Sequence, residues 1–110
     1  MSDPTPQIWG LKTCDTCRKA LKALPDAAFR DIRAEPLTGE EIANLLTTFG
    51  DSALNRASTT WRGLSEAERA TPPAELLAAH PALMKRPVIK AGADWHLGWT
   101  PATRKALGVV

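Results

Sequence analysis

The chain has 110 residues, enough for one modest hydrophobic core, and we expect a single domain over residues 1–110. Its 14 Lys and Arg against 12 Asp and Glu give a net charge of +2, too small to indicate direct binding of nucleic acid or a membrane surface. The opening MSDPTPQIWG has no basic and apolar leader, and no apolar run approaches the roughly 18 residues of a membrane span, so we expect a cytoplasmic protein.

The first part of the chain predicts a strand, a helix and a second strand. Residues 7–11 form an apolar run that follows Pro6 and is too short for a helix, so we expect a strand. The next segment ends at Pro25 and carries apolar residues at the spacing of one helix face, namely Cys17, Ala20, Leu21 and Leu24. Residues 27–32 predict the second strand, and two strands joined by a helix favour a right-handed parallel crossover.

The middle of the chain predicts helices. Thr38 and Glu41 have the spacing of a capping box and precede apolar residues at helical spacing. Ser65 and Glu68 repeat the capping pattern further along. Residues 38–83 therefore predict a helical insertion between two parts of a sheet.

The last part of the chain predicts a hairpin and a final helix. Residues 87–90 form a short apolar run, and residues 91–94 form a turn. A strand with one buried apolar face follows, formed by Trp95, Leu97 and Trp99. Thr100 followed by Pro101 predicts the start of the last helix. The order is β-α-β, helical insertion, β-β-α, which defines an α/β fold.

The sequence Cys14-Asp15-Thr16-Cys17 stands where the first strand ends and the first helix begins. There Cys14 meets unpaired backbone N–H groups, which stabilise a thiolate more than a thiol. We therefore expect a lowered pKa and a sulfur that is nucleophilic near neutral pH. Positive side chains nearby would add to this effect, namely Lys12, Arg18 and Lys19.

Two roles are open for Cys17. One helical turn along from Cys14, it can attack a mixed disulfide on that sulfur and close an intramolecular disulfide. It also shares the apolar helix face, where a cysteine acts as a small hydrophobic residue. Two cysteines without a secretory leader favour redox or metal chemistry, but zinc needs four ligands and His80 and His96 lie 16 positions apart. We expect no metal site.

Three separated segments carry a resemblance to a known family. They are residues 8–20, IWGLKTCDTCRKA, residues 55–62, NRASTTWR, and residues 80–89, HPALMKRPVI. Together they resemble the arsenate reductase (ArsC) family, in its Spx and YffB-type branch. The resemblance implies a thioredoxin-like fold with a four-stranded mixed sheet and a helical insertion, which agrees with the predicted order of elements.

The resemblance also implies roles for individual residues. Cys14 attacks an oxyanion or disulfide substrate, while Arg56 and Arg86 hold the negative charge, because a guanidinium stays charged and presents a planar set of donors. Lys12 is grouped with these substrate-binding residues, and Pro87 corresponds to the cis-proline beside the active-site cysteine of the fold. No tightly bound cofactor is implied. Glutathione or thioredoxin is the expected electron donor, and thioredoxin or glutaredoxin the expected protein partner.

One departure from the family separates three functional hypotheses. Arsenate reductases of the family use a third arginine after the hairpin, and residues 97–100 contain none. We therefore expect a thiol-disulfide reductase that acts on a glutathione or protein disulfide. One alternative is an Spx-like redox-sensing regulator that binds RNA polymerase. The other is a genuine arsenate reductase whose third cation is Arg104.

Overall fold

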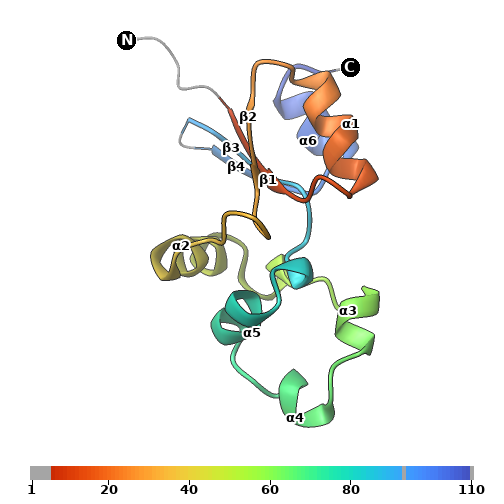
Figure 1. Ribbon diagram of the computed structural model, residues 1–110. Helices are drawn as coiled ribbons and strands as arrows, with labels where there is room; N and C mark the ends of the chain where they lie inside the picture. The colour runs from red at the N-terminus through yellow and green to blue at the C-terminus, as the bar shows by residue number, and fades with distance from the viewer. Residues whose placement is uncertain (1–5, 93, 110) are drawn as a thin grey trace. The chain divides into compact units, whose positions relative to one another are not determined.

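The computed structural model describes residues 6–92 and 94–109, and the chain divides into two compact units. The first, which we call the sheet unit, comprises Met1–Ile32 and Arg86–Val110. The second, which we call the helical unit, comprises Arg33–Lys85. Figure 1 traces both units along the chain.

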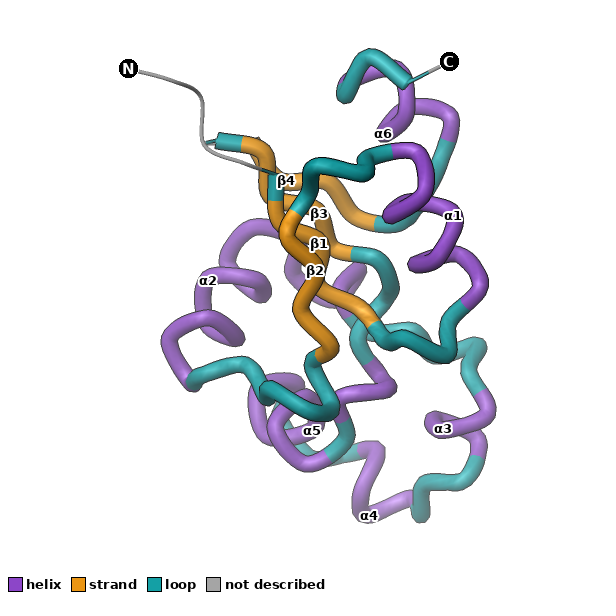
Figure 2. Tube along the Cα trace, turned by 45° about the horizontal axis from the view of Figure 1, so that its top comes forward, coloured by secondary structure: helices purple, strands orange, loops and turns teal. Residues whose placement is uncertain are grey.

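The sheet unit is built on a four-stranded mixed sheet in the order β2-β1-β3-β4, which Figure 2 shows in orange. β1 (Gln7–Gly10) pairs in parallel with β2 (Ala28–Asp31), and α1 (Asp15–Ala23) connects them. β3 (Val88–Ala91) runs antiparallel to both β1 and β4 (Asp94–Leu97), so the last two strands form the predicted hairpin. β1 therefore lies inside the sheet, and the loop that leaves it leads to the two cysteines.

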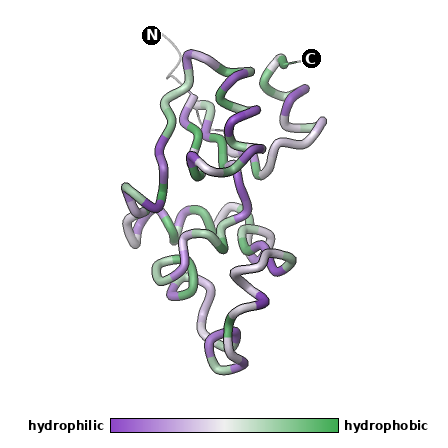
Figure 3. The backbone as a smooth tube through the Cα atoms, turned by 45° about the vertical axis from the view of Figure 1, so that its right-hand side comes forward, coloured by the Kyte–Doolittle hydropathy of each residue, from purple (hydrophilic) through white to green (hydrophobic). Residues whose placement is uncertain are grey.

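α1 and α6 (Pro101–Ala106) cover one face of this sheet (Figure 1). The core beneath them consists of Ile8, Ala20 and Ile89, with Leu21, Leu24, Ala27, Phe29, Trp99 and Leu107 packed against it. α1 turns its apolar residues to this core and its charged residues outward, an alternation that Figure 3 shows in green and purple along the helix. Burial of this apolar face holds α1 against the sheet.

Trp95 and Trp99 lie on opposite faces of the sheet, so the prediction that they share one buried face is wrong. The Trp95 ring meets Trp9 edge to face, with 5.4 Å between the ring centroids. Trp99 instead packs against the core around Ile8, on the other side of β1. The cause is Gly98, whose φ of 79° ends the strand and turns the chain before Trp99.

α2 (Gly39–Phe49) and α5 (Pro73–Ala79) pack against each other in the helical unit. Their buried residues are Ile42 and Leu45 on α2 and Leu76 and Leu77 on α5. The predicted capping box at the start of α2 is present. Glu41 N–H donates to the Thr38 hydroxyl at 3.1 Å, and Thr38 N–H donates to the Glu41 carboxylate at 2.8 Å.

Two shorter helices, α3 (Thr59–Arg62) and α4 (Glu66–Arg69), separate α2 from α5 along the chain. α4 begins with the second predicted capping box. α3 is not predicted from the sequence, because four residues are too few to show an apolar periodicity. It starts at Ser58, whose hydroxyl accepts the N–H of Trp61 at 3.1 Å. Two 3₁₀ turns, η1 (Gly50–Ala53) and η2 (Pro81–Leu83), complete the unit.

The observed order of elements confirms the predicted α/β fold, with a four-stranded mixed sheet and a helical segment between its two parts. The single-domain organisation over residues 1–110 stays a prediction. In the described part of the chain, no helix is both long and apolar enough to cross a membrane.

Candidate active site

Cys14 is the N-cap residue of α1, as the sequence predicts. Its backbone is extended, with φ −87° and ψ 119°, and its carbonyl accepts the N–H of Arg18 at 3.0 Å. Its own N–H donates to the Leu11 carbonyl at 3.0 Å and closes a tight turn. The half-buried side chain therefore presents a free thiol at the first turn of the helix, where backbone N–H groups have no helical partner.

Two hydrogen bonds hold the loop that places Cys14. The Lys12 N–H donates to a carboxylate oxygen of Asp31 at 3.1 Å, and Arg18 Nε–H donates to the Lys12 carbonyl at 2.8 Å. Arg18 is thus engaged with the loop backbone, while the Lys12 side chain is exposed. The sequence reasoning missed Asp31, because it reaches this loop only through the pairing of β2 with Gly10 at the end of β1.

The pKa of Cys14 is lowered, as the sequence predicts. Partial burial raises the pKa, but several other effects together lower it by more. These are hydrogen bonds from the N–H and the thiol of Cys17, the positive charge of Arg86, and a hydrogen bond from the Thr16 N–H. Because the two amides belong to the first turn of α1, the helix N-terminus contributes as expected. More of Cys14 is therefore thiolate near neutral pH than of an unperturbed cysteine.

Cys17 is fully buried on the apolar face of α1, with 0% of its surface exposed. Burial raises the pKa of its thiol to about 12, and the hydrogen bond to Cys14 and the negative charge of that sulfur add to the rise. Within the pair, Cys17 is therefore the thiol that donates and Cys14 the thiolate that accepts. Cys17 is at once a core residue and the immediate neighbour of Cys14.

Arg86 and Pro87 enter the sheet unit just before β3. The peptide bond between them is cis, as the resemblance implies, and Pro87 is fully buried. The Pro87 carbonyl accepts the N–H of Gly98 at 2.8 Å, which ties this segment to the end of β4. Arg86 is half-buried, and its charge acts on both cysteines. The sheet unit thus brings Arg86 together with Cys14 and Cys17.

Arg56, the other predicted anion-binding arginine, belongs to the helical unit. Its guanidinium lies 3.7 Å from a carboxylate oxygen of Asp51 and 5.3 Å from the centroid of the Trp61 ring. The guanidinium of Arg69 lies 5.7 Å from the same ring and donates to the carbonyls of Trp61 and Arg62. With 47% of its side chain exposed, Arg56 keeps surface open to a ligand, and its role in binding substrate stays a prediction.

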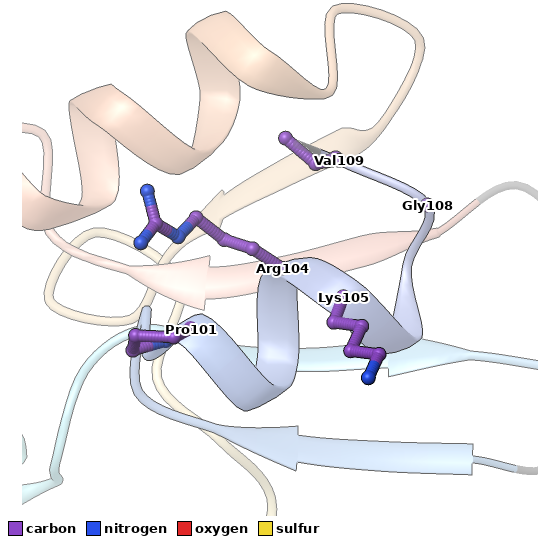
Figure 4. Close-up of a pocket in the computed structure, with 5 residues that line it drawn as sticks. All are labelled: Pro101, Arg104, Lys105, Gly108 and Val109. Carbon is purple, nitrogen blue, oxygen red and sulfur yellow. The ribbon is translucent and has the colours of Figure 1, made fainter.

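Arg104 of α6 is the arginine named in the arsenate hypothesis. Figure 4 shows the Arg104 side chain running from α6 toward α1, whereas the Lys105 side chain points away from α1. Both line a surface cavity of about 330 Å³. The Nε atom of Arg104 is buried and has no hydrogen-bond partner among the described residues. Its N–H is therefore an uncommitted donor.

The arrangement suits thiol chemistry. It combines a half-buried sulfur with a lowered pKa, a second thiol that donates to it, and a cation close to both. Such a sulfur can attack an electrophilic sulfur or an oxyanion while the cation holds the negative charge. Within residues 6–92 and 94–109, no three His, Cys, Asp or Glu side chains gather into a group that could hold a metal ion.

Comparison with known proteins gives consistent matches. The sequence matches the ArsC family over residues 9–107. The solved structure of the YFFB protein superposes with a TM-score of 0.84 at 33% identity, covering 93% of this chain and 97% of that one. An arsenate reductase (ArsC) related protein from Brucella melitensis superposes with a TM-score of 0.75 at 34% identity, covering 100% and 99%. An uncharacterized protein of Haemophilus influenzae is 38% identical over an alignment of 91 positions, and the match covers 74% of this chain and 80% of that protein.

The fold and the site define a thioredoxin-like protein with a free thiol at the start of its first helix. The chain belongs to the ArsC family, as the three sequence segments predict. Membership of this family supports a thiol-dependent reductase role.

Proposed function

We propose that the chain is a thiol-disulfide reductase that acts on glutathione-containing or protein disulfides, with Cys14 as its nucleophile. The observation that carries the proposal is the surroundings of Cys14. It is the N-cap residue of α1, and the amides of the first turn, the Cys17 thiol and the charge of Arg86 all lower its pKa. These contacts favour the thiolate, which is the attacking form in disulfide exchange.

In the first step the Cys14 thiolate attacks one sulfur of the substrate disulfide. A bond forms between this sulfur and Cys14, the substrate S–S bond breaks, and the leaving thiolate takes a proton from solvent. Arg86 attracts a carboxylate of the substrate, because a guanidinium can pair with it through two parallel N–H donors. Arg56 and Lys12 are proposed to bind further negative charge on the substrate.

In the second step Cys17 resolves the mixed disulfide. Formation of that disulfide removes the negative charge of Cys14 and the hydrogen bond that help to keep Cys17 protonated. The pKa of Cys17 therefore falls at the stage at which its thiolate is needed. Cys17 loses its proton and attacks Cys14, the Cys14–Cys17 disulfide forms, and the second half of the substrate leaves as a thiolate. Two electrons from glutathione or thioredoxin then return the pair to its reduced form.

Turnover by the purified protein tests this proposal. The substrates are glutathione disulfide, a glutathionylated peptide and arsenate, each offered with glutathione or a thioredoxin system as the electron donor. We expect turnover of the two disulfides and none by Cys14→Ser. Turnover of no substrate, or full turnover by Cys14→Ser, would contradict the proposal.

Arsenate reduction is a second candidate that one observation favours. Arg104 lines a surface cavity of about 330 Å³, so its guanidinium lies where an oxyanion can approach it. Arsenate turnover that Arg104→Ala abolishes and Lys105→Ala preserves would support this candidate. Absence of arsenate turnover in the unmodified protein would exclude it.

A further inference from the structure

Gly10, the last residue of β1, lies against the sulfur of Cys17. The geometry points to Gly10 as a positioning residue for the resolving step: the missing side chain leaves the space from which the Cys17 sulfur reaches Cys14. This inference rests on the proposed thiol-disulfide reductase function and names a residue that the exchange needs beyond the two cysteines and Arg86.

The space around Gly10 is filled by Cys17. A Cβ atom built on Gly10 would collide with Cys17 Sγ, and it would lie 3.2 Å from Cys17 Cβ and 3.6 Å from Cε2 of Phe29. The only neighbour that a methyl group would overlap outright among these atoms is therefore the sulfur of the resolving thiol. The Cys17 sulfur can therefore keep its observed position only if residue 10 has no side chain.

Backbone conformation does not explain the glycine. The described glycines with positive φ are Gly50, Gly92, Gly98 and Gly108, so Gly10 has a backbone that other residues can adopt. Space is what requires a glycine here. The strand is also poorly able to retreat from an added methyl group, because Gly10 pairs with Asp31 in the sheet and its carbonyl accepts the Ile32 N–H at 2.9 Å.

An added methyl group would therefore displace the Cys17 sulfur rather than the strand. α1 is fixed next to Cys17 by the buried Ala20, so the sulfur would have to turn away or the first turn would have to lift. Either movement takes the Cys17 sulfur out of the position in which it interacts with Cys14. The resolving attack forms the Cys14–Cys17 bond and breaks the bond from Cys14 to the substrate sulfur. This displacement reaction needs the attacking, central and leaving sulfurs in line.

The direct test measures how fast the mixed disulfide between Cys14 and glutathione forms and disappears after the reduced protein is mixed with glutathione disulfide. We expect Gly10→Ala to form the mixed disulfide on Cys14 but to release glutathione from it about tenfold more slowly or worse, by mass spectrometry of rapidly quenched samples. Iodoacetamide alkylation of Cys14, measured at a pH at which it is fully ionised, should be unchanged. The matched control is Gly39→Ala, since Gly39 has no atom within 4 Å of the added methyl group and no positive φ.

The outcomes separate this inference from the proposed function. If the unmodified protein forms no mixed disulfide, the proposed function fails. If it forms and resolves the mixed disulfide and Gly10→Ala resolves it equally fast, the role of Gly10 is overturned while the proposed function stands.

A stability cycle covers the case in which Gly10→Ala folds poorly. Cys17→Ala removes the sulfur that the methyl group would strike, so it should make room for that group. We expect Gly10→Ala to lower the denaturation midpoint in the unmodified protein, and to lower it by about half as much or less in the Cys17→Ala background. Equal losses in the two backgrounds would show that Gly10 does not serve the sulfur of Cys17.

Discussion

The state of Cys14 depends on neighbours that can be removed one at a time. Arg86 acts through its charge, Cys17 through its thiol and its N–H, and Thr16 through its N–H. Arg86 and Cys17 act through their side chains, whereas the N–H groups of Cys17 and Thr16 remain when side chains are replaced. We therefore expect each single substitution to change the reactivity of Cys14 in part and not to abolish it.

Replacement of Arg86 by Ala should raise the pKa of Cys14. The positive charge of Arg86 lowers that pKa, so its removal reduces the thiolate fraction at every pH below the titration midpoint. We expect the midpoint of the iodoacetamide rate against pH to move upward, with little change in the rate at alkaline pH. Arg86→Lys should restore part of the shift, because the charge returns without the planar guanidinium.

Lys85→Ala is the charge-matched control for this substitution. Lys85 is exposed and directly precedes Arg86 in the chain. Its removal should leave the titration of Cys14 in place. An equal upward shift in both variants would mean that net charge, and not the position of Arg86, controls the cysteine.

At the scale of elements, α1 and the loop before it form the active-site element, and α2 is a suitable reference for purely structural effects. α2 is stabilised by the reciprocal hydrogen bonds of Thr38 and Glu41. Thr38→Ala removes the hydroxyl that accepts the Glu41 N–H and leaves the hydrogen bond from the Thr38 N–H to the Glu41 carboxylate. We expect a loss of about 1 kcal/mol in the free energy of unfolding, measured by denaturant titration, and an unchanged Cys14 titration.

Thr47→Ala serves as the comparison for Thr38→Ala. Thr47 is exposed within the same helix, so its replacement by a better helix former should not destabilise the protein. A similar loss of stability in both variants would contradict the assignment of Thr38 as the cap.

Elements whose sequences carry periodicity or capping residues are predictable, and these include the strands, α1, α2 and α6. Prediction from the sequence fails where the course of the chain depends on one dihedral angle, or where an element has too few residues to show a pattern. Gly98 turns the chain after β4 and sends Trp99 to the other face, and α3 is too short to show a pattern. Neither feature changes the apolar content of the sequence, which is the signal that the prediction uses.

The same distinction applies to the candidate site. Cys14, Cys17 and the Arg86–Pro87 pair are predicted, because reactive residue types and family motifs mark them. Gly10 and Asp31 are not, because their contacts arise from strand pairing and from helix packing. A glycine at the end of a strand, four positions before the first cysteine of the motif, is the signal that could have indicated Gly10.

At the scale of the whole molecule, the proposed anion-binding arginines come from both units. Arg86 belongs to the sheet unit and Arg56 to the helical unit. The proposed reductase then uses residues from distant parts of the sequence, while the nucleophile and the resolving thiol belong to one helix. Because Arg86 also lowers the pKa of Cys14, Arg56 is the arginine through which substrate binding can be altered without altering the activation of the sulfur.

Replacement of Arg56 by Ala should weaken the use of anionic disulfides. We expect a higher KM for glutathione disulfide, by about tenfold, because one guanidinium–carboxylate interaction is lost. The KM for the uncharged hydroxyethyl disulfide should not change, and neither should the titration of Cys14. Equal losses for the two substrates would indicate a general structural defect and would remove Arg56 from the substrate site.

The most direct test of the whole account is the rate of Cys14 alkylation as a function of pH. The Cys17→Ser variant, which leaves one thiol in the chain, identifies the signal, and the unmodified protein gives the value of interest. We predict for the unmodified protein a titration midpoint below the value of about 8.5 for an unperturbed cysteine, with the rate falling as the pH drops through that midpoint. A midpoint at or above 8.5 would contradict the claim that the first turn of α1, Cys17 and Arg86 hold this sulfur as an anion.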